Sequence, residues 1–325
     1  MSNKKNSVLE ISKPKAVTFK TRLRHTKEKW KASDFSAYIF ILPAMIIVSM
    51  FIIYPAIWSL VASFRNINPM ELRDSGLFEV VGEWIGLDNY IDVLGNQLFR
   101  KSLLNTIYFA AIFIPLTMFA SVTIAMLLDK GIKGSSVLRS IFFIPYVISI
   151  VSASLVFMII FAGDTGLVNA VLAYFGIESI SFLSETGWAM PVIALMSSWR
   201  RVGYFMLIYL AALQNIPKSL YEASDIDGAT SMHKFRYITW PMLGRINMVV
   251  FILLMIFSFN IFQEVFVMTG GGPADSTITV PFLIYNEAFT FYDMGSAAAM
   301  SYILFAVVVF VGVVQHKINK NKLDY

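Results

Sequence analysis

Five polar side chains interrupt stretches of this sequence that are otherwise apolar, and they are the residues best placed to do chemistry. Arg200 and Arg201 interrupt one stretch, and Asn260, Gln263 and Glu264 interrupt another. A charged residue at the centre of a bilayer costs about 2.5–3.5 kcal/mol on insertion scales, so such residues usually have a function. A guanidinium attracts anions, and amide and carboxylate groups hydrogen-bond hydroxyl groups. The pattern predicts a polar path for a solute through a membrane.

Structural roles for the same residues remain open. The arginines could pair with an acid of a partner subunit or extend toward the membrane surface. Adjacent helical residues point about 100° apart, so one arginine at most faces a lumen squarely. Asn260, Gln263 and Glu264 fall at i, i+3 and i+4, on one helical face, which could line a pore or join two helices. The arginine pair would suit an anionic solute, such as an acidic oligosaccharide or a phosphate ester.

No group of residues in the chain is typical of an enzyme. The chain has no cysteine, and its histidines, His25, His233 and His316, are far apart with no metal-ligating neighbour at helical spacing. The glycine-rich run at 269–282 faces outward by the topology given below, and no string in the chain matches a phosphate-binding P-loop. We therefore predict no catalytic residue, no metal site, no cofactor held by this chain and no nucleic-acid ligand.

The elements that must hold the polar residues are membrane helices. Apolar residues make up 57% of the 325 positions and charged residues only 14%, whereas about a quarter of a soluble protein is charged. A bilayer core needs about 20 apolar residues per helix. Six segments meet that need, at 36–64, 103–128, 139–162, 188–213, 247–268 and 295–315. We predict an all-α polytopic membrane protein with six transmembrane helices, surrounded by lipid.

Lysine and arginine placement predicts the orientation of these spans. Residues 1–35, the 129–139 loop, the loop between the fourth and fifth spans and the C-terminal tail together hold 20 of the 26 basic residues. The opposite side holds four, all between residues 65 and 101. We therefore expect both termini and the loop at about 214–246 to be cytoplasmic.

The chain divides accordingly into three parts. We predict a basic cytoplasmic segment at 1–35, a transmembrane domain at 36–315 that includes the 214–246 loop, and a cytoplasmic tail at 316–325. The basic segment is too long for a cleavable signal peptide, and the apolar stretch after it has the length of a span. This segment could lie on anionic lipid as a surface helix, or it could serve only to fix the orientation.

The loop between the fourth and fifth spans has a pattern of its own from Tyr221 to Leu243. Pro217 can open a short helix, because a helix start leaves that N–H without a partner. Gly228 lets the chain turn without a Cβ penalty, and Pro241 closes the segment. We predict two short helices joined at Gly228, which form a compact knob on the membrane surface.

This 221–243 loop resembles the EAA loop of permeases of ATP-binding-cassette importers. The matching residues are Glu222, Ala223, Ser224, Asp227, Gly228, Ala229, Phe235, Ile238 and Pro241, and the chain departs from the family pattern at Ser224 and Trp240. The runs at 138–149, 210–220 and 267–273 are similar to the saccharide branch of that family. The resemblance implies the type I importer permease fold, and it assigns all of the matching residues except Ile238 to contact with a separate ATPase.

The resemblance also implies the remaining parts of the complex. These are a second permease that forms a heterodimer with this chain, two ATPase subunits that bind ATP and magnesium, and an external solute-binding protein. We expect a transport subunit, itself not an enzyme, in a bacterial or archaeal inner membrane, which imports a saccharide or oligosaccharide that could be acidic. The alternative is an ion-coupled secondary transporter, a class that typically has carboxylates at the membrane midplane and internal repeats.

Overall fold

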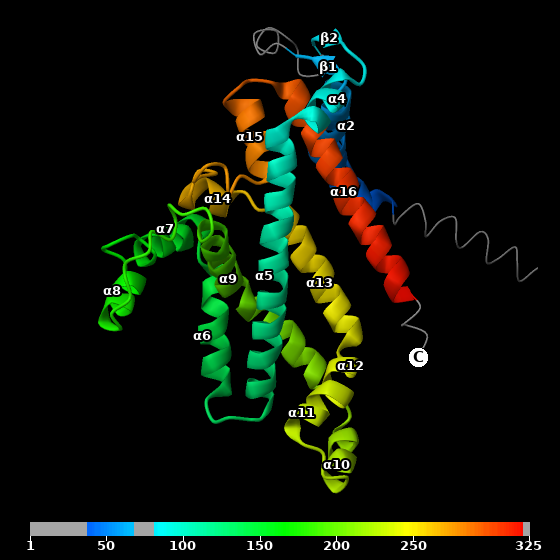
Figure 1. The fold of residues 1–325 in the computed structure, drawn as a ribbon. Coiled ribbons are helices and arrows are strands. Elements are labelled where there is room, and N and C mark those ends of the chain that lie inside the picture. The colour runs from blue at the N-terminus through cyan, green and yellow to red at the C-terminus, as the bar shows by residue number, and fades with distance from the viewer. Residues whose placement is uncertain (1–37, 68–80, 321–325) are drawn as a thin grey trace, which may run out of the picture. The chain divides into compact units, whose positions relative to one another are not determined.

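The computed structural model describes residues 38–67 and 81–320, and helices dominate this part of the chain (Figure 1). The chain divides into two compact units, Met1–Trp58 and Ser59–Tyr325. A helix runs from Tyr38 to Ala62 and contains a π-helical stretch, η1 (Ser49–Ile53), followed by α2 (Tyr54–Ala62). This helix agrees with the predicted span at 36–64. The predicted basic segment at 1–35 and the last residues of the tail, 321–325, lie outside the described residues.

The second unit contains the other elements. They follow one another as β1 (Arg65–Asn66), β2 (Glu83–Trp84), α4 (Asp88–Gly95), α5 (Gln97–Asp129), α6 (Ser135–Val147), α7 (Ile150–Ile160), α8 (Leu167–Tyr174), α9 (Ala189–Leu213), α10 (Lys218–Ile226), α11 (Ser231–Lys234), η2 (Phe235–Thr239), α12 (Trp240–Met242), α13 (Gly244–Phe259), α14 (Gln263–Met268), α15 (Val280–Phe289) and α16 (Met294–Lys320). The two strands pair antiparallel, with Arg65 opposite Trp84.

Three of the described helices are long and apolar enough to cross a membrane. They are Tyr38–Ala62, α5, and the part of α16 from Met294 to Gln315. Two pairs of helices also qualify if each pair is taken as one bent span, which gives five at most. The helix α9 nearly matches the bounds predicted for the fourth span, although it carries Arg200 and Arg201. A helical, membrane-spanning fold is confirmed, and the count of six spans stays a prediction.

The predicted spans at 139–162 and 247–268 are wrong as continuous helices. The first is divided into α6 and α7, which meet at 98°. The backbone is extended at Ile148 and Ser149, with ψ of 141° and 134°, so the helical hydrogen-bond ladder cannot continue. The second ends at Phe259, and α14 starts only at Gln263. Hydropathy misses the first break because the residues on both sides of it are apolar, whereas the polar Asn260, Gln263 and Glu264 lie at the second.

The helices α5 and α9 pack along each other in the centre of the second unit. Small and hydroxyl residues allow close approach, as is common between membrane helices. Thr117 Oγ1 donates to Ser198 Oγ at 3.0 Å, and Ser121 Oγ donates to the Val202 carbonyl at 3.1 Å. On another side of α9, α6 passes so near to Gly203 that a Cβ there would lie 1.9 Å from a backbone oxygen of α6. Glycine is therefore required at this crossing.

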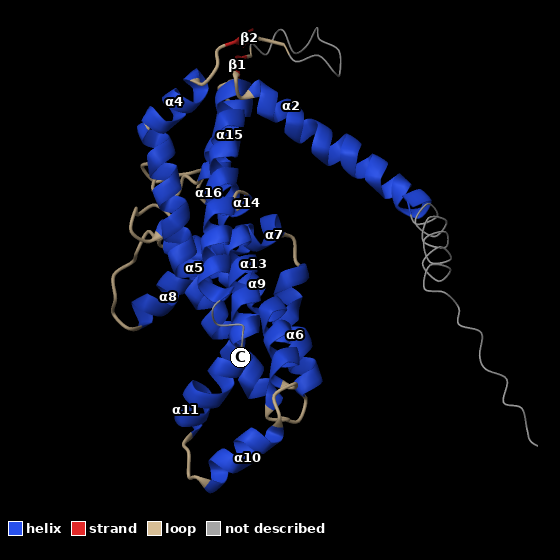
Figure 2. Ribbon diagram, turned by 90° about the vertical axis from the view of Figure 1, so that its right-hand side faces the viewer, coloured by secondary structure: helices blue, strands red, loops and turns tan. Residues whose placement is uncertain are grey.

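Two of the three loops predicted for the outer side lie at the opposite end of the second unit from the loops predicted for the cytoplasm. Figure 1 shows α4, α15 and the two strands at one end, with α10, α11 and the turn between α5 and α6 at the other. Figure 2 shows the same separation from the side. The 163–187 loop, which contains α8, lies between the two ends in both views (Figure 1, Figure 2). The fold therefore agrees with the predicted grouping of the other loops, and the assignment of one end to the cytoplasm stays a prediction.

Candidate functional site

The first helix of the 221–243 loop, α10, ends in a Schellman motif at Gly228. The Gly228 N–H donates to the Asp225 carbonyl at 3.1 Å, and the Ala229 N–H donates to the Ser224 carbonyl at 2.9 Å. Gly228 has φ of +71°, in the left-handed region, and a Cβ there would meet no atom within 4 Å. Two short helices joined at a glycine are thus confirmed. Within this chain, backbone conformation and not lack of space favours glycine at this position.

The second half of the loop is tied back to the first. Tyr221 Oη and Thr239 Oγ1 share a hydrogen bond of 2.9 Å, and Lys234 forms an ion pair with Asp225. Both connections are made within the loop, so the chain itself sets the shape of the knob.

Prolines mark both ends of the loop. Pro217 occupies the N-cap of α10, one residue before the first helical position. In an α-helix the ring of Pro241 would clash with the carbonyl of Tyr237, four residues earlier. In the π-helical turn η2, just before this proline, the Trp240 N–H donates to the Phe235 carbonyl. This turn moves the Tyr237 carbonyl away from the proline ring.

The loop residues assigned to ATPase contact differ in exposure. Glu222, Ala223, Asp227, Gly228 and Pro241 are exposed, Ala229 and Phe235 are half-buried, and Ser224 is buried with its hydroxyl donating to the Tyr221 carbonyl at 2.7 Å. Sequence reasoning missed three exposed apolar side chains, Ile226, Met232 and Tyr237, with exposed fractions of 88%, 71% and 68%. Apolar residues inside a polar loop were the signal that could have found them. Such a mixture of exposed apolar and acidic groups is typical of a surface that contacts a partner.

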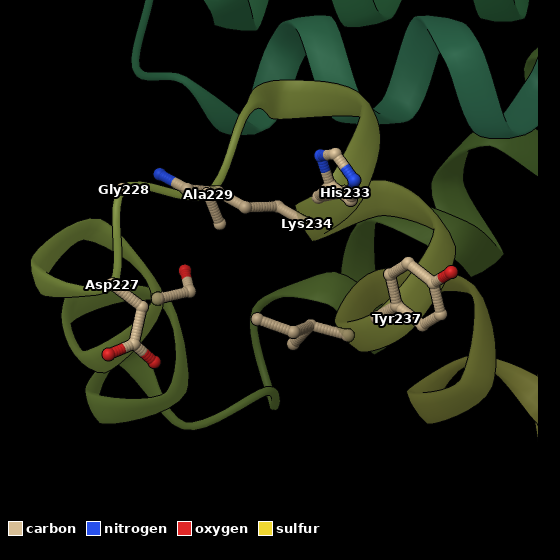
Figure 3. Close-up of a pocket in the computed structure, with 8 residues that line it drawn as sticks. Asp227, Gly228, Ala229, His233, Lys234 and Tyr237 are labelled. Atoms are coloured by element: carbon tan, nitrogen blue, oxygen red, sulfur yellow. The ribbon is translucent and has the colours of Figure 1, made fainter.

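A cleft of about 400 Å³ opens between the two halves of the loop. Its lining residues are Ser224, Asp227, Gly228, Ala229, His233, Lys234, Tyr237 and Ile238. Figure 3 shows Asp227 on the α10 side, Tyr237 on the other side, and the Lys234 side chain reaching across. The lining offers a carboxylate, an ammonium group and a phenol ring, which suits the insertion of a partner's side chain.

Two polar residues of the predicted path, Arg201 and Glu264, form a buried ion pair that the sequence did not predict. Arg201 Nη1 lies 3.2 Å from Glu264 Oε1, and Ser197 Oγ lies 3.4 Å from the same oxygen. Both charged residues are buried, with exposed fractions of 8% for Arg201 and 3% for Glu264. The guanidinium carbon also lies 5.6 Å and 4.8 Å from the ring centres of Phe113 and Phe257, within cation–π range. The partner acid of Arg201 thus comes from its own chain.

Arg200 is in a different environment from its neighbour. Its side chain is half-buried, and its Nε–H donates to the carbonyl of Ile148 at 3.2 Å. Ile148 is the C-cap residue that directly follows α6. Arg200 therefore lies beside the break between α6 and α7. The expectation that adjacent arginines point in different directions is confirmed.

The predicted polar face of Asn260, Gln263 and Glu264 is wrong, because no single helix contains them. Asn260 follows the end of α13, and its amide donates to the Ile256 carbonyl at 2.8 Å. Such local side-chain bonds compete with a continuing helix. Asn260 and Gln263 are exposed and Glu264 is buried, so the three side chains do not act as one stripe. Whether any of them contacts a solute stays a prediction.

Comparison with known proteins gives a consistent result. The family model of the binding-protein-dependent transport system inner membrane component matches residues 114–323. The lactose transport system permease protein LacF of Rhizobium radiobacter is 35% identical over 288 residues, which cover 87% of this chain and 93% of that protein. The sn-glycerol-3-phosphate transport system permease protein UgpA of Pectobacterium atrosepticum is 30% identical over 294 residues, covering 90% and 97% of the two chains.

A solved structure supports the fold. A chain of a bacterial alginate transporter of the ATP-binding-cassette class, crystallised with a periplasmic protein that binds an alginate pentasaccharide, superposes with a TM-score of 0.77. The alignment covers 91% of this chain and 98% of that chain at 20% sequence identity. The predicted permease fold is thereby confirmed. The chain belongs to the family of binding-protein-dependent transport system inner membrane components.

Proposed function

We propose that this chain is the transmembrane permease subunit of an ATP-driven, binding-protein-dependent importer of a saccharide or a related hydroxylated solute. Its relatives are named as permeases for lactose and for sn-glycerol 3-phosphate, which supports a small polyhydroxylated solute. The observation that carries the proposal is the 221–243 loop, a helix–glycine–helix knob with an exposed acidic and apolar surface.

The ATPase that powers transport is a separate subunit in this proposal, and it holds the ATP and magnesium. Glu222 and Asp227 supply negative charge for a basic partner surface, and Ile226, Met232 and Tyr237 supply the apolar contact. Charged groups at such a contact favour the correct partner and orientation, while exposed apolar groups supply buried area. The cleft beside Gly228 receives a side chain of the ATPase.

The complete importer contains a second permease, two ATPase subunits and an external solute-binding protein. The termini and the 221–243 loop of this chain face the cytoplasm of a bacterial or archaeal cell, since positive charge gathers at that end. Arg200, Asn260 and Gln263 lie near the solute path, and Arg201 and Glu264 support the helices that bound it.

An ion-coupled secondary transporter is the less favoured alternative. Such a transporter needs a carboxylate that can exchange its proton or ion inside the membrane. In the described parts of the predicted spans, Glu264 is the only carboxylate, and it is already paired with Arg201.

A pair of glycine variants tests the proposal. Gly228 and Gly131 have nearly the same backbone φ, +71° and +72°, and a Cβ added at either would meet no atom within 4 Å. Gly131 lies in the turn between α5 and α6, at the same end of the second unit. Within this chain, an aspartate at either position should therefore lower the stability of the fold by about the same amount.

We expect Gly228→Asp to lose the ATPase during co-purification, or to lose solute-stimulated ATP hydrolysis, while the permease still inserts in the membrane. Gly131→Asp should keep both. Glu222→Lys should behave as Gly228→Asp does, and a matching charge reversal on the ATPase should restore part of the activity. Normal co-purification and normal stimulated hydrolysis in Gly228→Asp would show that the loop does not couple the subunits.

A further inference from the structure

The chain neutralises one of its two membrane arginines and leaves the other charged. Arg201 is paired with Glu264, whereas Arg200 forms no ion pair with any residue in the described ranges 38–67 and 81–320. Its Nε–H is occupied by the Ile148 carbonyl, and neither terminal Nη group has a partner within those ranges. The free edge of a guanidinium can hold a carboxylate or phosphate with two parallel hydrogen bonds.

The surroundings of Arg200 are aromatic and partly open. Tyr146 and Tyr204 stack with ring centres 4.8 Å apart and an interplanar angle of 15°. Both tyrosines are half-buried, and Tyr146 precedes by two residues the Ile148 whose carbonyl accepts from Arg200. Tyr204 follows Arg200 by four residues on α9, so the two side chains lie on one helical face. Trp199, the residue before Arg200, is exposed over 41% of its surface.

Close helix packing fixes this arrangement. A glycine at position 203 lets α6 touch the backbone of α9 at Phe142, which brings Tyr146 against Tyr204. The break after α6 then leaves the Ile148 carbonyl free of helical bonding, and it accepts the Arg200 Nε–H. The Ile148 carbonyl thus holds Arg200 through its Nε–H, and the two Nη groups are left to bind another partner.

We propose that Arg200, with the stacked Tyr146 and Tyr204, forms a subsite for an anionic group of the transported solute, a carboxylate or a phosphate. The inference rests on the proposed function and gives it a substrate class. The guanidinium binds the charged group, and the phenol hydroxyls and ring edges contact the hydroxylated part of the solute. Arg201 contributes no net charge to this subsite.

The position of Arg200 favours a solute over a lipid as the source of the anion. The helix α9 has 25 residues and is about 37 Å long at 1.5 Å per residue, and Arg200 lies near its middle. Lipid phosphates lie beyond a hydrocarbon core about 30 Å thick, so they are about 15 Å away from that level. A carboxylate of the second permease is the other possible source, and the experiment distinguishes it.

The test uses the full complex of both permeases and the ATPase, purified in lipid nanodiscs. Two probe pairs differ mainly in charge: methyl glucuronide with methyl glucoside, and glycerol 3-phosphate with glycerol. Binding is measured by saturation-transfer NMR titration. The variants are Arg200→Gln and Arg200→Lys, and the matched control is Arg100→Gln, because the Arg100 Nε–H also donates to a backbone carbonyl, that of Leu94 at 2.9 Å.

We expect the wild-type complex to bind the charged member of at least one pair more tightly than the neutral member. Arg200→Gln should weaken binding of that charged probe on the order of ten- to hundredfold, as expected for a lost hydrogen-bonded charge, and leave the neutral probe unchanged. Arg200→Lys should bind the charged probe with an affinity between those of the wild type and Arg200→Gln, since it keeps the charge but not the paired donors. Arg100→Gln should match the wild type.

Three results would overturn the inference. The first is a wild-type complex with no preference for charge in either pair, and the second is a preference that survives Arg200→Gln. The third is loss of the second permease from Arg200→Gln preparations, which would mean that Arg200 pairs with that subunit. Loss of the ATPase from the wild-type complex would instead count against the proposed function.

Discussion

The buried pair of Arg201 and Glu264 makes the sharpest prediction about stability. Their charged atoms are 3.2 Å apart, and each side chain is at least nine-tenths buried. Breaking such a pair by removing one member typically costs about 3–5 kcal/mol, because the remaining charge is left without a partner away from water. The two members should differ, since a carboxylate can become neutral by taking up a proton and a guanidinium cannot.

We therefore expect Glu264→Gln to be the more damaging single change and to lower the free energy of unfolding by about 3–5 kcal/mol. Two phenylalanine rings near the guanidinium offset only part of this, at roughly 0.5–2 kcal/mol each. Arg201→Met leaves a carboxylate that can be protonated, and it should cost about 1–3 kcal/mol, the usual penalty of an unsatisfied buried polar group. The double variant should be more stable than Glu264→Gln alone.

The assay is thermal unfolding of the purified permease in detergent, followed by tryptophan fluorescence, for all four members of the cycle. A double variant that loses the sum of the two single losses would refute the reasoning, because it would show no coupling between the residues. Equal losses in the two single variants would refute the argument from protonation.

The other predictions concern packing, pH and orientation. Gly203→Ala should destabilise the fold by about 3 kcal/mol or more, since its Cβ would lie 1.9 Å from the Phe142 carbonyl oxygen, and membrane expression with thermal unfolding measures this. In α15, outside the predicted spans, burial and then a neighbouring carboxylate raise the pKa of Glu287. The folded state therefore binds the proton of the Glu287 carboxyl more tightly than the unfolded state does. The stability that this protonation contributes is present at acid pH and is lost as pH rises through the folded pKa. Glu287→Gln should raise the unfolding temperature at pH 7 and leave it unchanged at pH 4, and an equal shift at both would contradict this. A cysteine at the exposed Thr165 should react with an impermeant reagent added to intact cells, and one at the exposed Ser231 should not. The reverse labelling would invert the proposed orientation.

The sequence predicted well those features that depend on local chemistry. The φ of Gly228 follows from a glycine between two short polar helices, because only glycine adopts the left-handed region without penalty. The bounds of α9 and of the helix from Tyr38 to Ala62 follow from apolar length. A long apolar run has few alternatives in a bilayer, where every backbone group must be paired internally.

The sequence could not predict features that depend on a few backbone angles or on distant contacts. The break at Ile148–Ser149 interrupts an apolar run whose hydropathy does not change across it. At the break after Phe259, the polar Asn260, Gln263 and Glu264 fit one helical face as well as they fit a helix end. The ion pair joins residues 63 positions apart, so it exists only because α14 is packed against α9. Periodicity placed Glu264 on one face with Asn260, and that inference failed once the helix ended between them.

The proposed function gives the second break a mechanical consequence. The loop helices and α13 meet at 71°, and only the buried Leu243 lies between them. The loop is therefore joined directly to α13. The helix α13 then runs to the break, beyond which α14 packs on both α7 and α9. In the proposed function, a docked ATPase that displaces the loop also displaces α13, which ends at the break before the segment that carries Glu264. Because Glu264 is bonded to Arg201, and Arg200 is the next residue on α9, movement of α14 acts on the helix that presents the proposed anion subsite.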